Sequence, residues 1–305
     1  APVRYDVPQP YSTHAPVAVE IADMDDDGLS DVVVNQRAGI AVLRQNSSGT
    51  LDPAEFHASV GTDYDCNVYT LAAGDLSGDG LADVVDKAHA DTEYGIEVYT
   101  QNASGLLDPP VAYALAHGGA NHLRTGDLNG DGLSDIAVML QSTDHLAAVF
   151  HQQPDHSFGP TVQIATPSDD LWSSRALLVD DLDLDCRDDL VIATNGNWDR
   201  SKLVLHYQLP SGQLGPPVVT AAGDIPSAVK SADFNGDGLP DLVSFDTASF
   251  RITFYMQSAD GRFGAFGSVP VDDAQMTSSH VMAVGDINGD GRPDVVAASG
   301  INTPG

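Results

Sequence analysis

An acidic nonapeptide occurs six times in this chain, at intervals of 52 to 54 residues, and no other feature limits the fold as strongly. Its pattern is D-x-[DNS]-x-D-G-x-x-D, and the copies begin at Asp23, Asp75, Asp127, Asp181, Asp233 and Asp286. Repetition at a fixed period of this length is typical of solenoids and propellers. Oxygen-bearing side chains at positions 1, 3, 5 and 9 of a tight loop are the ligands that a hard cation such as Ca²⁺ requires. One pattern therefore predicts both an architecture and a ligand.

Each repeat reads as four short β-strands. In the fifth copy the loop is followed by the alternating run 242–245, then by Ile252 to Met256, and then by a stretch from Phe263 to Val271. Gly, Asp, Ser and Pro separate these runs, as in antiparallel hairpins. No window keeps an apolar period of 3.6 residues for three turns, so little helix is expected. We predict an all-β fold, a β-propeller of six four-stranded blades, with seven blades as the alternative.

A second repetition shows which strand of a blade each segment forms. A glutamine ends the expected third strand in five units: Gln45, Gln101, Gln152, Gln208 and Gln257. The run from Pro2 to Tyr5 is similar to the run from Pro110 to Tyr113, which lies in an expected fourth strand. The N-terminal strand should therefore pair with the C-terminal blade and close the ring, which removes an exposed edge.

We predict one domain over residues 1–305. Its repeat units are approximately 15–60, 67–115, 119–166, 173–221, 227–271, and 279–305 together with 1–10. The sixth unit is too short after Asp294 for the third strand that the other units have, so this blade is incomplete or the protein continues.

The motif positions give the candidate metal ligands, namely side chains at positions 1, 3, 5 and 9 and the backbone carbonyl at position 7. The glycine at position 6 suits a left-handed turn around the ion. The candidates are Asp23, Asp25, Asp27, Leu29 and Asp31; Asp75, Ser77, Asp79, Leu81 and Asp83; Asp127, Asn129, Asp131, Leu133 and Asp135; Asp181, Asp183, Asp185, Arg187 and Asp189; Asp233, Asn235, Asp237, Leu239 and Asp241; and Asp286, Asn288, Asp290, Arg292 and Asp294.

We expect up to six Ca²⁺ ions, one per repeat, with unequal affinities. Ser77 replaces the carboxylate or amide at position 3 of the second loop, and Cys186 replaces the glycine of the fourth loop. A residue with a Cβ resists positive φ at a cost of roughly 1 kcal/mol. Both loops should therefore bind more weakly. Sulfur is a poor ligand for Ca²⁺, so the Cys186 thiol is not expected to coordinate.

These loops, with Phe263-Gly264-Ala265 and Phe158-Gly159-Pro160 downstream, resemble the FG-GAP or VCBS-type repeat. That repeat is the propeller unit of integrin α-subunit heads and of many secreted bacterial proteins. The resemblance covers nearly the whole chain and implies a calcium-binding propeller. It does not select one function, since similar propellers serve in adhesion, in sugar binding and beside polysaccharide-degrading domains. The departures are Ser77, Cys186 and the incomplete last blade.

The charge of the chain excludes some partners and indicates a compartment. The formal net charge is −31, and twenty of the 44 acidic residues occupy positions 1, 3, 5 and 9 of the motifs. Such a surface disfavours nucleic acid and anionic membrane. No apolar run of about 18 residues occurs, so no membrane span is expected. Weak Ca²⁺ modules work at about 10⁻⁴–10⁻³ M, which favours an extracellular or periplasmic location, and Ala1 would suit a mature secreted product.

The ligand-binding face is expected opposite the calcium loops, where the connections between strands repeat least. Aromatic rings beside polar groups there suit a sugar or a protein hot spot. The candidates are Tyr64, His122, Trp172, Trp198 and Arg200. The alternative for each tryptophan is that it fills a gap between blades.

Catalysis finds little support in the sequence. No G-x-S-x-G, P-loop or H-E-x-x-H run occurs, so no catalytic residue is proposed. His151 and His206 lie within expected strands and read as packed residues. Cys66 and Cys186 fall two units apart on opposite faces, so no disulfide between them is expected.

The sequence therefore predicts a secreted, calcium-stabilised propeller that acts as a binding or adhesion module, with carbohydrate as one candidate ligand. A polysaccharide-active enzyme or its accessory propeller is the first alternative, and a structural calcium-dependent spacer is the second. The identity of the glycan or extracellular protein partner, the presence of flanking domains and the oligomeric state are not encoded in any pattern we recognise.

Overall fold

The computed structural model describes residues 5, 7, 18–36, 39–59, 70–88, 95–115, 119–141, 147–164, 174–194, 200–271 and 281–298. These residues form β-strands and turns, with no α-helix among them, which confirms the all-β prediction. The chain divides into two compact units. The first comprises Ala1–Gly126, Gly132–Ser142 and Ala148–Gln163, and the second comprises Asp127–Asp131, Thr143–Ala147 and Ile164–Gly305.

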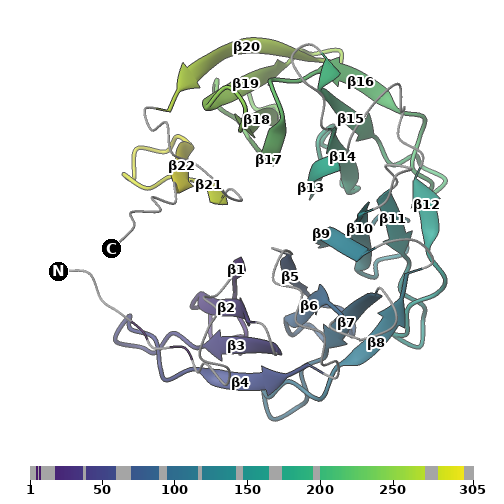
Figure 1. Ribbon diagram of the computed structural model, residues 1–305, viewed down its shortest axis with the longest axis vertical. Helices are drawn as coiled ribbons and strands as arrows, with labels where there is room; N and C mark the ends of the chain where they lie inside the picture. The colour runs from purple at the N-terminus through teal and green to yellow at the C-terminus, as the bar shows by residue number, and fades with distance from the viewer. Residues whose placement is uncertain are drawn as a thin grey trace. The chain divides into compact units, whose positions relative to one another are not determined.

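The first unit contains three four-stranded sheets, each a meander in which every strand pairs with the next one along the chain (Figure 1). Their first strands β1, β5 and β9 pack beside one another in that order. The strands are β1 (Ala18–Ala22), β2 (Asp31–Gln36), β3 (Gly39–Leu43) and β4 (Glu55–Ala58); β5 (Leu71–Gly74), β6 (Asp83–Lys87), β7 (Gly95–Tyr99) and β8 (Val111–Ala114); and β9 (Gly119–Gly126), β10 (Asp135–Gln141), β11 (Ala147–Phe150) and β12 (Val162–Ile164).

The second unit contains two four-stranded sheets and one sheet with two described strands. Here β13, β17 and β21 pack beside one another. The strands are β13 (Ser174–Asp180), β14 (Asp189–Thr194), β15 (Lys202–His206) and β16 (Val218–Ala221); β17 (Pro226–Ala232), β18 (Asp241–Asp246), β19 (Arg251–Gln257) and β20 (Phe263–Pro270); and β21 (Val281–Gly285) and β22 (Asp294–Ala298).

Successive meanders packed through their first strands are the blades of a β-propeller, as the sequence predicts. The segments expected to complete the last blade are residues 299–305 and the N-terminal run. They lie outside the described residues, apart from residues 5 and 7. Closure of the ring therefore stays a prediction, as does the single domain.

The core of each unit lies between neighbouring sheets. In the first unit Met24, Val42, Val84 and Tyr99 belong to one buried cluster, and in the second unit Leu182, Leu205, Leu242 and Tyr255 belong to another. Every residue of β14 and β18, the second strands of the two complete sheets of the second unit, is buried. The middle of β14, from Leu190 to Ala193, is continuously apolar, as is typical of a strand buried on both faces.

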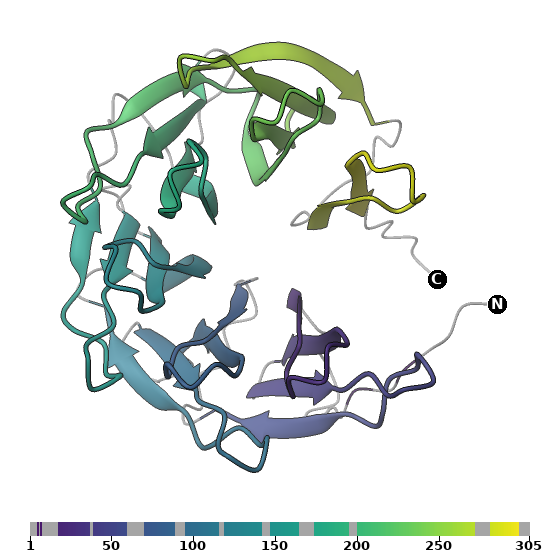
Figure 2. The ribbon, with the colours of Figure 1, turned by 180° about the vertical axis from the view of Figure 1, so that it is seen from behind.

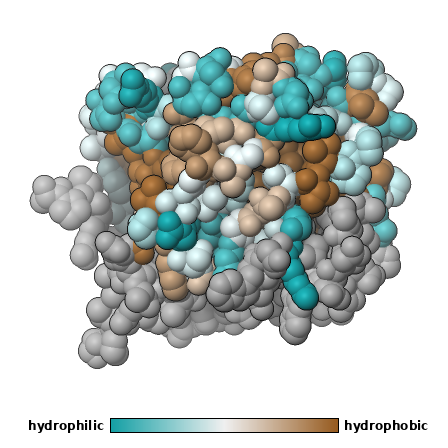
Figure 3. All heavy atoms as spheres, turned by 90° about the horizontal axis from the view of Figure 1, so that it is seen from above, coloured by the Kyte–Doolittle hydropathy of each residue, from teal (hydrophilic) through white to brown (hydrophobic). Residues whose placement is uncertain are grey.

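The outer strands have one solvent-facing side. Val218, Val219, Phe266 and Val269 on β16 and β20 are exposed large hydrophobic residues. Figure 3 looks onto the molecule from the side where Figure 1 draws these two strands, and hydrophobic side chains are visible there between polar ones.

A buried polar network in the second unit joins β18 and β19 to the connection between β16 and β17. Asp246 at the end of β18 accepts hydrogen bonds from Ser244 Oγ at 2.7 Å and from Thr253 Oγ1. Tyr255 Oη accepts the N–H of Gly223 at 2.8 Å, and a Cβ at Gly223 would collide with the Asp246 carboxylate. Burial raises the pKa of Asp246 to about 6, and Asp224 raises it further. The two hydroxyl donors act in the opposite direction.

We predict that Asp246→Asn stabilises the protein at neutral pH. Because the pKa in the folded state lies above the unfolded value, folding favours the protonated carboxyl, and its stabilising effect is lost as pH rises through about 6. The free energy of unfolding of the variant should exceed that of the wild type by about 1–3 kcal/mol at pH 7.5, with no such gain at pH 4.

Urea unfolding of both proteins across this pH range, at one calcium concentration, measures the difference. Asp260→Asn is the matched control, because Asp260 is exposed and its pKa is lowered by the Ser258 hydroxyl. A gain from Asp246→Asn that is the same at pH 4 and pH 7.5 would contradict the prediction.

Candidate metal-binding loops

Each acidic nonapeptide connects the first strand of a sheet to the second, so it lies at the sheet end where the turn between the third and fourth strands also lies. In the first sheet Ala22 of β1 pairs with Asp31 of β2, and the loop spans the residues between them. Figure 2 shows the acidic loops of each unit on the side that faces the viewer. Within each unit the loops therefore share one side, because the same connection of the meander forms every one of them.

The aspartate at position 1 organises each loop by accepting backbone N–H groups. Asp23 Oδ2 accepts from Gly28 at 2.8 Å, and Asp23 Oδ1 accepts from Asp27 at 3.2 Å. The corresponding acceptors of the other loops are Asp75, Asp127, Asp181, Asp233 and Asp286. In the fifth and sixth loops these N–H groups, that of position 6 foremost, lower the pKa of the position 1 carboxyl. In these two loops the same hydrogen bonds thus hold the turn and favour the ionised carboxylate.

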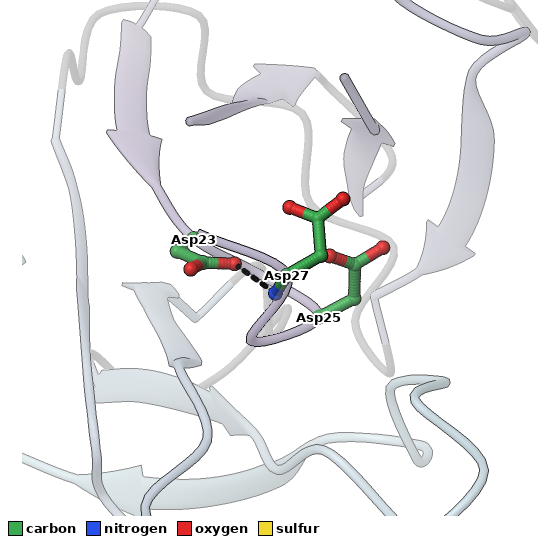
Figure 4. A group of neighbouring side chains, drawn as sticks. All are labelled: Asp23, Asp25 and Asp27. Atoms are coloured by element: carbon green, nitrogen blue, oxygen red, sulfur yellow. Dashed lines mark hydrogen bonds between the residues drawn. The ribbon is translucent and has the colours of Figure 1, made fainter. Parts of the chain in front are cut away.

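The carboxylates at positions 1, 3 and 5 converge in the first and fourth loops. Asp23, Asp25 and Asp27 each offer an oxygen, and these oxygens lie within 4.8 Å of one another (Figure 4). Asp181, Asp183 and Asp185 form the same arrangement. Burial raises the pKa of Asp183, and the charges of Asp185 and Asp181 raise it further. Three oxygens held this close repel one another and suit a hard cation.

The aspartate at position 9 is buried and accepts two backbone hydrogen bonds. Asp31 Oδ2 accepts the N–H of Met24 at 2.8 Å, and Asp31 Oδ1 accepts the N–H of Gln45 at 2.6 Å. Asp83, Asp189 and Asp241 each bind the equivalent two N–H groups.

Burial raises the pKa of Asp83 to about 6 and that of Asp189 to about 7, against the effect of their N–H donors. Position 9 is not a member of either three-carboxylate group. Its role as a metal ligand stays a prediction, beside the structural role found here.

At position 7 the predicted ligand is a carbonyl, and the structure shows how the N–H of the same residue is held. Leu29, Leu81, Arg187, Leu239 and Arg292 each donate this N–H to the carboxylate at position 5. The position 5 aspartate therefore fixes the second half of the loop before any ion binds.

The backbone is left-handed at two positions of every loop. Position 6 has φ between 80° and 86° at its five glycines and 66° at Cys186. Position 4 also has positive φ, at Asp26, Gly78, Gly130, Leu184, Gly236 and Gly289. The fourth loop is the only one with a side chain at both positions, so it carries the most backbone strain. Cys186 is exposed and its thiol is free.

A glutamine links each of the first four loops to the repeat that follows it. The Nε2 group of Gln101 donates to the carbonyl of Met24 at 2.5 Å, and that of Gln257 donates to the carbonyl of Leu182 at 2.7 Å. Gln152 binds the carbonyl of Leu76, and Gln208 binds the carbonyl of Asp127 at 2.7 Å. The sequence shows this glutamine only as a recurring strand end. Its repetition in register with the loops is the signal that could have predicted the bond.

The structure describes only two of the five residues expected on the ligand-binding face. His122 lies in β9 and is half-buried, and Arg200 lies before β15 and is exposed. Tyr64, Trp172 and Trp198 lie outside the described residues, as does Cys66. The predicted binding face and the predicted absence of a Cys66–Cys186 disulfide therefore stay predictions.

His206 is a buried residue of β15, whereas His151 lies directly after β11 and is half-buried. His151 Nδ1 lies 2.8 Å from Asp135 Oδ2, and His206 Nδ1 lies 2.9 Å from the carbonyl oxygen of Gly215. Burial lowers the pKa of His206. Neither histidine belongs to a carboxylate group that could hold a metal among the described residues.

Four-stranded meanders, each with an acidic loop between its first two strands, define a β-propeller repeat of the acidic-loop type. The chain matches the FG-GAP-like repeat at residues 23–85, 181–244 and 233–297, which together cover more than half of its length. The chain belongs to the FG-GAP-like repeat family.

A curated relative and two solved structures show the breadth of proteins with this fold. Integrin alpha pat-2 of Caenorhabditis briggsae is 23% identical over 241 residues, which are 66% of this chain and 20% of that protein, so the chain spans about a fifth of the relative's length. An Agrocybe aegerita lectin, described as recognising non-reducing terminal N-acetylglucosamine, is 21% identical with a TM-score of 0.61 over 92% of this chain and 73% of the lectin. A periplasmic gluconolactonase of Pseudomonas aeruginosa is 17% identical with a TM-score of 0.60 over 93% of this chain and 73% of the enzyme. At these identities the two structures establish the fold alone.

A further observation concerns membranes. Among the described residues, no helix has the length and apolar character needed to span a bilayer.

We predict that Cys186→Gly stabilises the protein. Glycine adopts φ of 66° without the steric cost that a Cβ brings, so the free energy of unfolding should rise by about 0.5–1 kcal/mol. Urea unfolding with and without calcium measures the change.

Gly238→Ala in the fifth loop is the matched control. It adds a Cβ at the same loop position, where φ is 86° and no atom lies within 4 Å of the new Cβ. The change in stability therefore reports only the strain of a left-handed backbone. This control should lose stability by a similar amount. A loss of stability in Cys186→Gly, or no change in both variants, would contradict the assignment of strain.

Proposed function

We propose that this chain is a secreted, calcium-stabilised β-propeller that acts as a binding or adhesion module. The observation that carries the calcium part is the convergence of Asp23, Asp25 and Asp27 within 4.8 Å, repeated by the three aspartates of the fourth loop. The donor set is entirely oxygen, which suits Ca²⁺ rather than Zn²⁺ or copper. The left-handed turns at positions 4 and 6 wrap the chain around this set before an ion arrives.

A cation would also relieve the electrostatic cost of the loops. Without it, the buried Asp83 and Asp189 have raised pKa values, and the carboxylates around Asp183 repel one another. Six ions at most, one per repeat, would neutralise charge that contributes heavily to the formal net charge of −31. The loops built on Ser77 and Cys186 would bind more weakly than the average.

The binding role is supported by the distribution of structure over the repeat. The aspartates of the acidic loops already bind backbone N–H groups of the same loops. We therefore expect a partner to bind the side opposite the loops, where the candidates are Tyr64, His122, Trp172, Trp198 and Arg200. Similarity to an integrin α chain favours an extracellular protein partner and an extracellular location, and similarity to a lectin favours a glycan. A polysaccharide-active enzyme or accessory propeller is the second candidate, since a gluconolactonase shares the fold. A structural spacer is the third.

Removing calcium should lower the melting temperature by several degrees. A site with a dissociation constant of about 10⁻⁴ M contributes roughly 2 kcal/mol at about 2 mM Ca²⁺, because the ion binds only the folded loop. Thermal unfolding in a chelator and after adding back Ca²⁺ measures the effect, with Mg²⁺ at equal concentration as the control. Identical melting curves with calcium and with chelator would refute calcium stabilisation.

Glycan arrays and immobilised extracellular matrix proteins test the binding face. Trp172→Ala and Trp198→Ala should reduce the bound signal at least ten-fold if these rings stack on the ligand. Phe266→Ala is the matched control, because Phe266 is a 77% exposed aromatic residue on the outer strand β20.

A signal on glycans that the tryptophan variants lose supports the carbohydrate reading, and a signal on proteins supports adhesion. Release of soluble product from a polysaccharide would assign an enzyme instead. No signal on any surface would leave the spacer as the function.

A further inference from the structure

The first and fourth loops differ from the others in their number of acidic groups. They are the two loops with aspartate at positions 1, 3 and 5, whereas position 3 is Ser77, Asn129, Asn235 or Asn288 elsewhere. A larger number of carboxylates ordinarily strengthens Ca²⁺ binding. On this basis alone, the first and fourth loops would be the strongest sites of the chain.

Each of these two loops also holds an arginine on one of its converging carboxylates. Arg44 Nη1 lies 3.5 Å from Asp25 Oδ2, at position 3 of the first loop. Arg187 Nη2 forms an ion pair with Asp185 Oδ2, at position 5 of the fourth loop. Asp25 and Asp185 belong to the two three-carboxylate groups, so each guanidinium pairs with a carboxylate that a bound cation would also need.

Both arginines are held in place rather than free in solvent. Arg44 Nη2 donates to the carbonyl of Gly105 at 2.5 Å and lies 3.7 Å from Glu55 Oε2. Arg187 Nε donates to the carbonyl of Gln208 at 3.4 Å. Their side chains are 17% and 29% exposed, so salt and water screen their charges less than those of a surface arginine.

The second, fifth and sixth loops hold their acidic side chains without an arginine pair in the described part of the chain. In the parts of the second, fifth and sixth loops that the structure describes, no ion pair reaches a loop carboxylate. In the fifth loop the amide of Asn235 instead donates to Asp237 Oδ2 at 3.0 Å. Arg292 occupies position 7 of the sixth loop, as Arg187 does in the fourth, without such a pair.

We propose that Arg44 and Arg187 set the cation affinity of the first and fourth loops by occupying their carboxylates when no ion is bound. Each guanidinium stabilises the ion-free loop and must give up its carboxylate contact, or remain beside the ion and repel it, when Ca²⁺ enters. The two loops richest in carboxylates therefore become weak sites, beside the second loop, which is weak because of Ser77. They would fill after the three loops that have asparagine at position 3. This inference rests on the proposed calcium binding.

Calcium titration of the chelator-stripped chain by calorimetry tests the proposal. Arg44→Thr introduces the residue that Thr100 provides at the equivalent position before Gln101, and Arg187→Leu introduces the residue found at position 7 of four other loops. The substitution at Arg187 keeps the position 7 carbonyl. In each variant one weak site should tighten by roughly ten-fold, with the total number of sites unchanged.

An arginine outside the loops serves as the control. Arg262 pairs with the exposed Asp260, and neither residue belongs to an acidic loop. Arg262→Ala should leave the titration unchanged.

Thermal unfolding separates affinity setting from a purely structural role. Without calcium, Arg44→Thr and Arg187→Leu should melt below the wild type, because they leave three carboxylates unneutralised. With saturating calcium the deficit should shrink or reverse, so the calcium-induced rise in melting temperature is larger than in the wild type. An equal loss with and without calcium would show that the arginines are only structural.

The outcomes distinguish this inference from the proposed function beneath it. If the wild type takes up no Ca²⁺, calcium binding itself fails. If the wild type binds Ca²⁺ and both arginine variants titrate like it, calcium binding stands and the role given to Arg44 and Arg187 is overturned.

Discussion

The rest of each repeat depends on the backbone hydrogen bonds that the buried carboxylate at position 9 accepts. A buried charge is costly unless its oxygens are hydrogen-bonded, and Asp31 meets this requirement with the N–H groups of Met24 and Gln45. One of these donors lies in the acidic loop and the other at the end of the third strand. A single aspartate therefore fixes the loop, the start of the second strand and the end of the third strand relative to one another. Since Met24 is itself a core residue, the same contact aligns the loop with the hydrophobic core.

Cohesion between repeats comes from a second polar contact at the same place. The glutamine whose N–H binds the position 9 aspartate uses its side-chain amide to bind the loop one repeat earlier, as Gln101 does with Met24. Position 9 and the glutamine thus form one chain of hydrogen bonds that runs along a unit from loop to loop. This arrangement explains why a glutamine recurs at or just after the end of the third strand, although every residue of a strand such as β7 is buried.

Much of the fold could be predicted from the sequence because the repeat displays it six times. Short strands, turn residues and a fixed period led to an all-β propeller with the strand phase that the structure has. The left-handed turn at position 6 was also predictable, since five of six copies have glycine there. Leu184 was not, because a non-glycine residue gives no sign of positive φ. Two hydrogen bonds were equally unpredictable. Asp31 accepts the N–H of Gln45, 14 positions away, and Gln101 donates to the carbonyl of Met24, 77 positions away. Such contacts follow from the packing of sheets and not from any local pattern.

The loops also illustrate how charge is balanced inside one repeat family. Carboxylates brought within 4.8 Å need a counter-charge, and this chain offers two. A divalent cation is the counter-charge proposed for every loop, whereas the described arginine pairs lie in the two loops where position 3 adds a third acid, Asp25 or Asp183. The arginine stabilises each of the two most acidic loops when no ion is bound. In the remaining loops the amide or hydroxyl at position 3 removes one negative charge and so reduces the repulsion. An uncharged residue at position 3 and a nearby arginine are thus two ways to reduce the repulsion between the loop carboxylates. Under the proposed calcium binding, loops with an arginine fill later than loops with an asparagine at position 3. A propeller that mixes them would respond to calcium over a wider concentration range than one built from six identical loops.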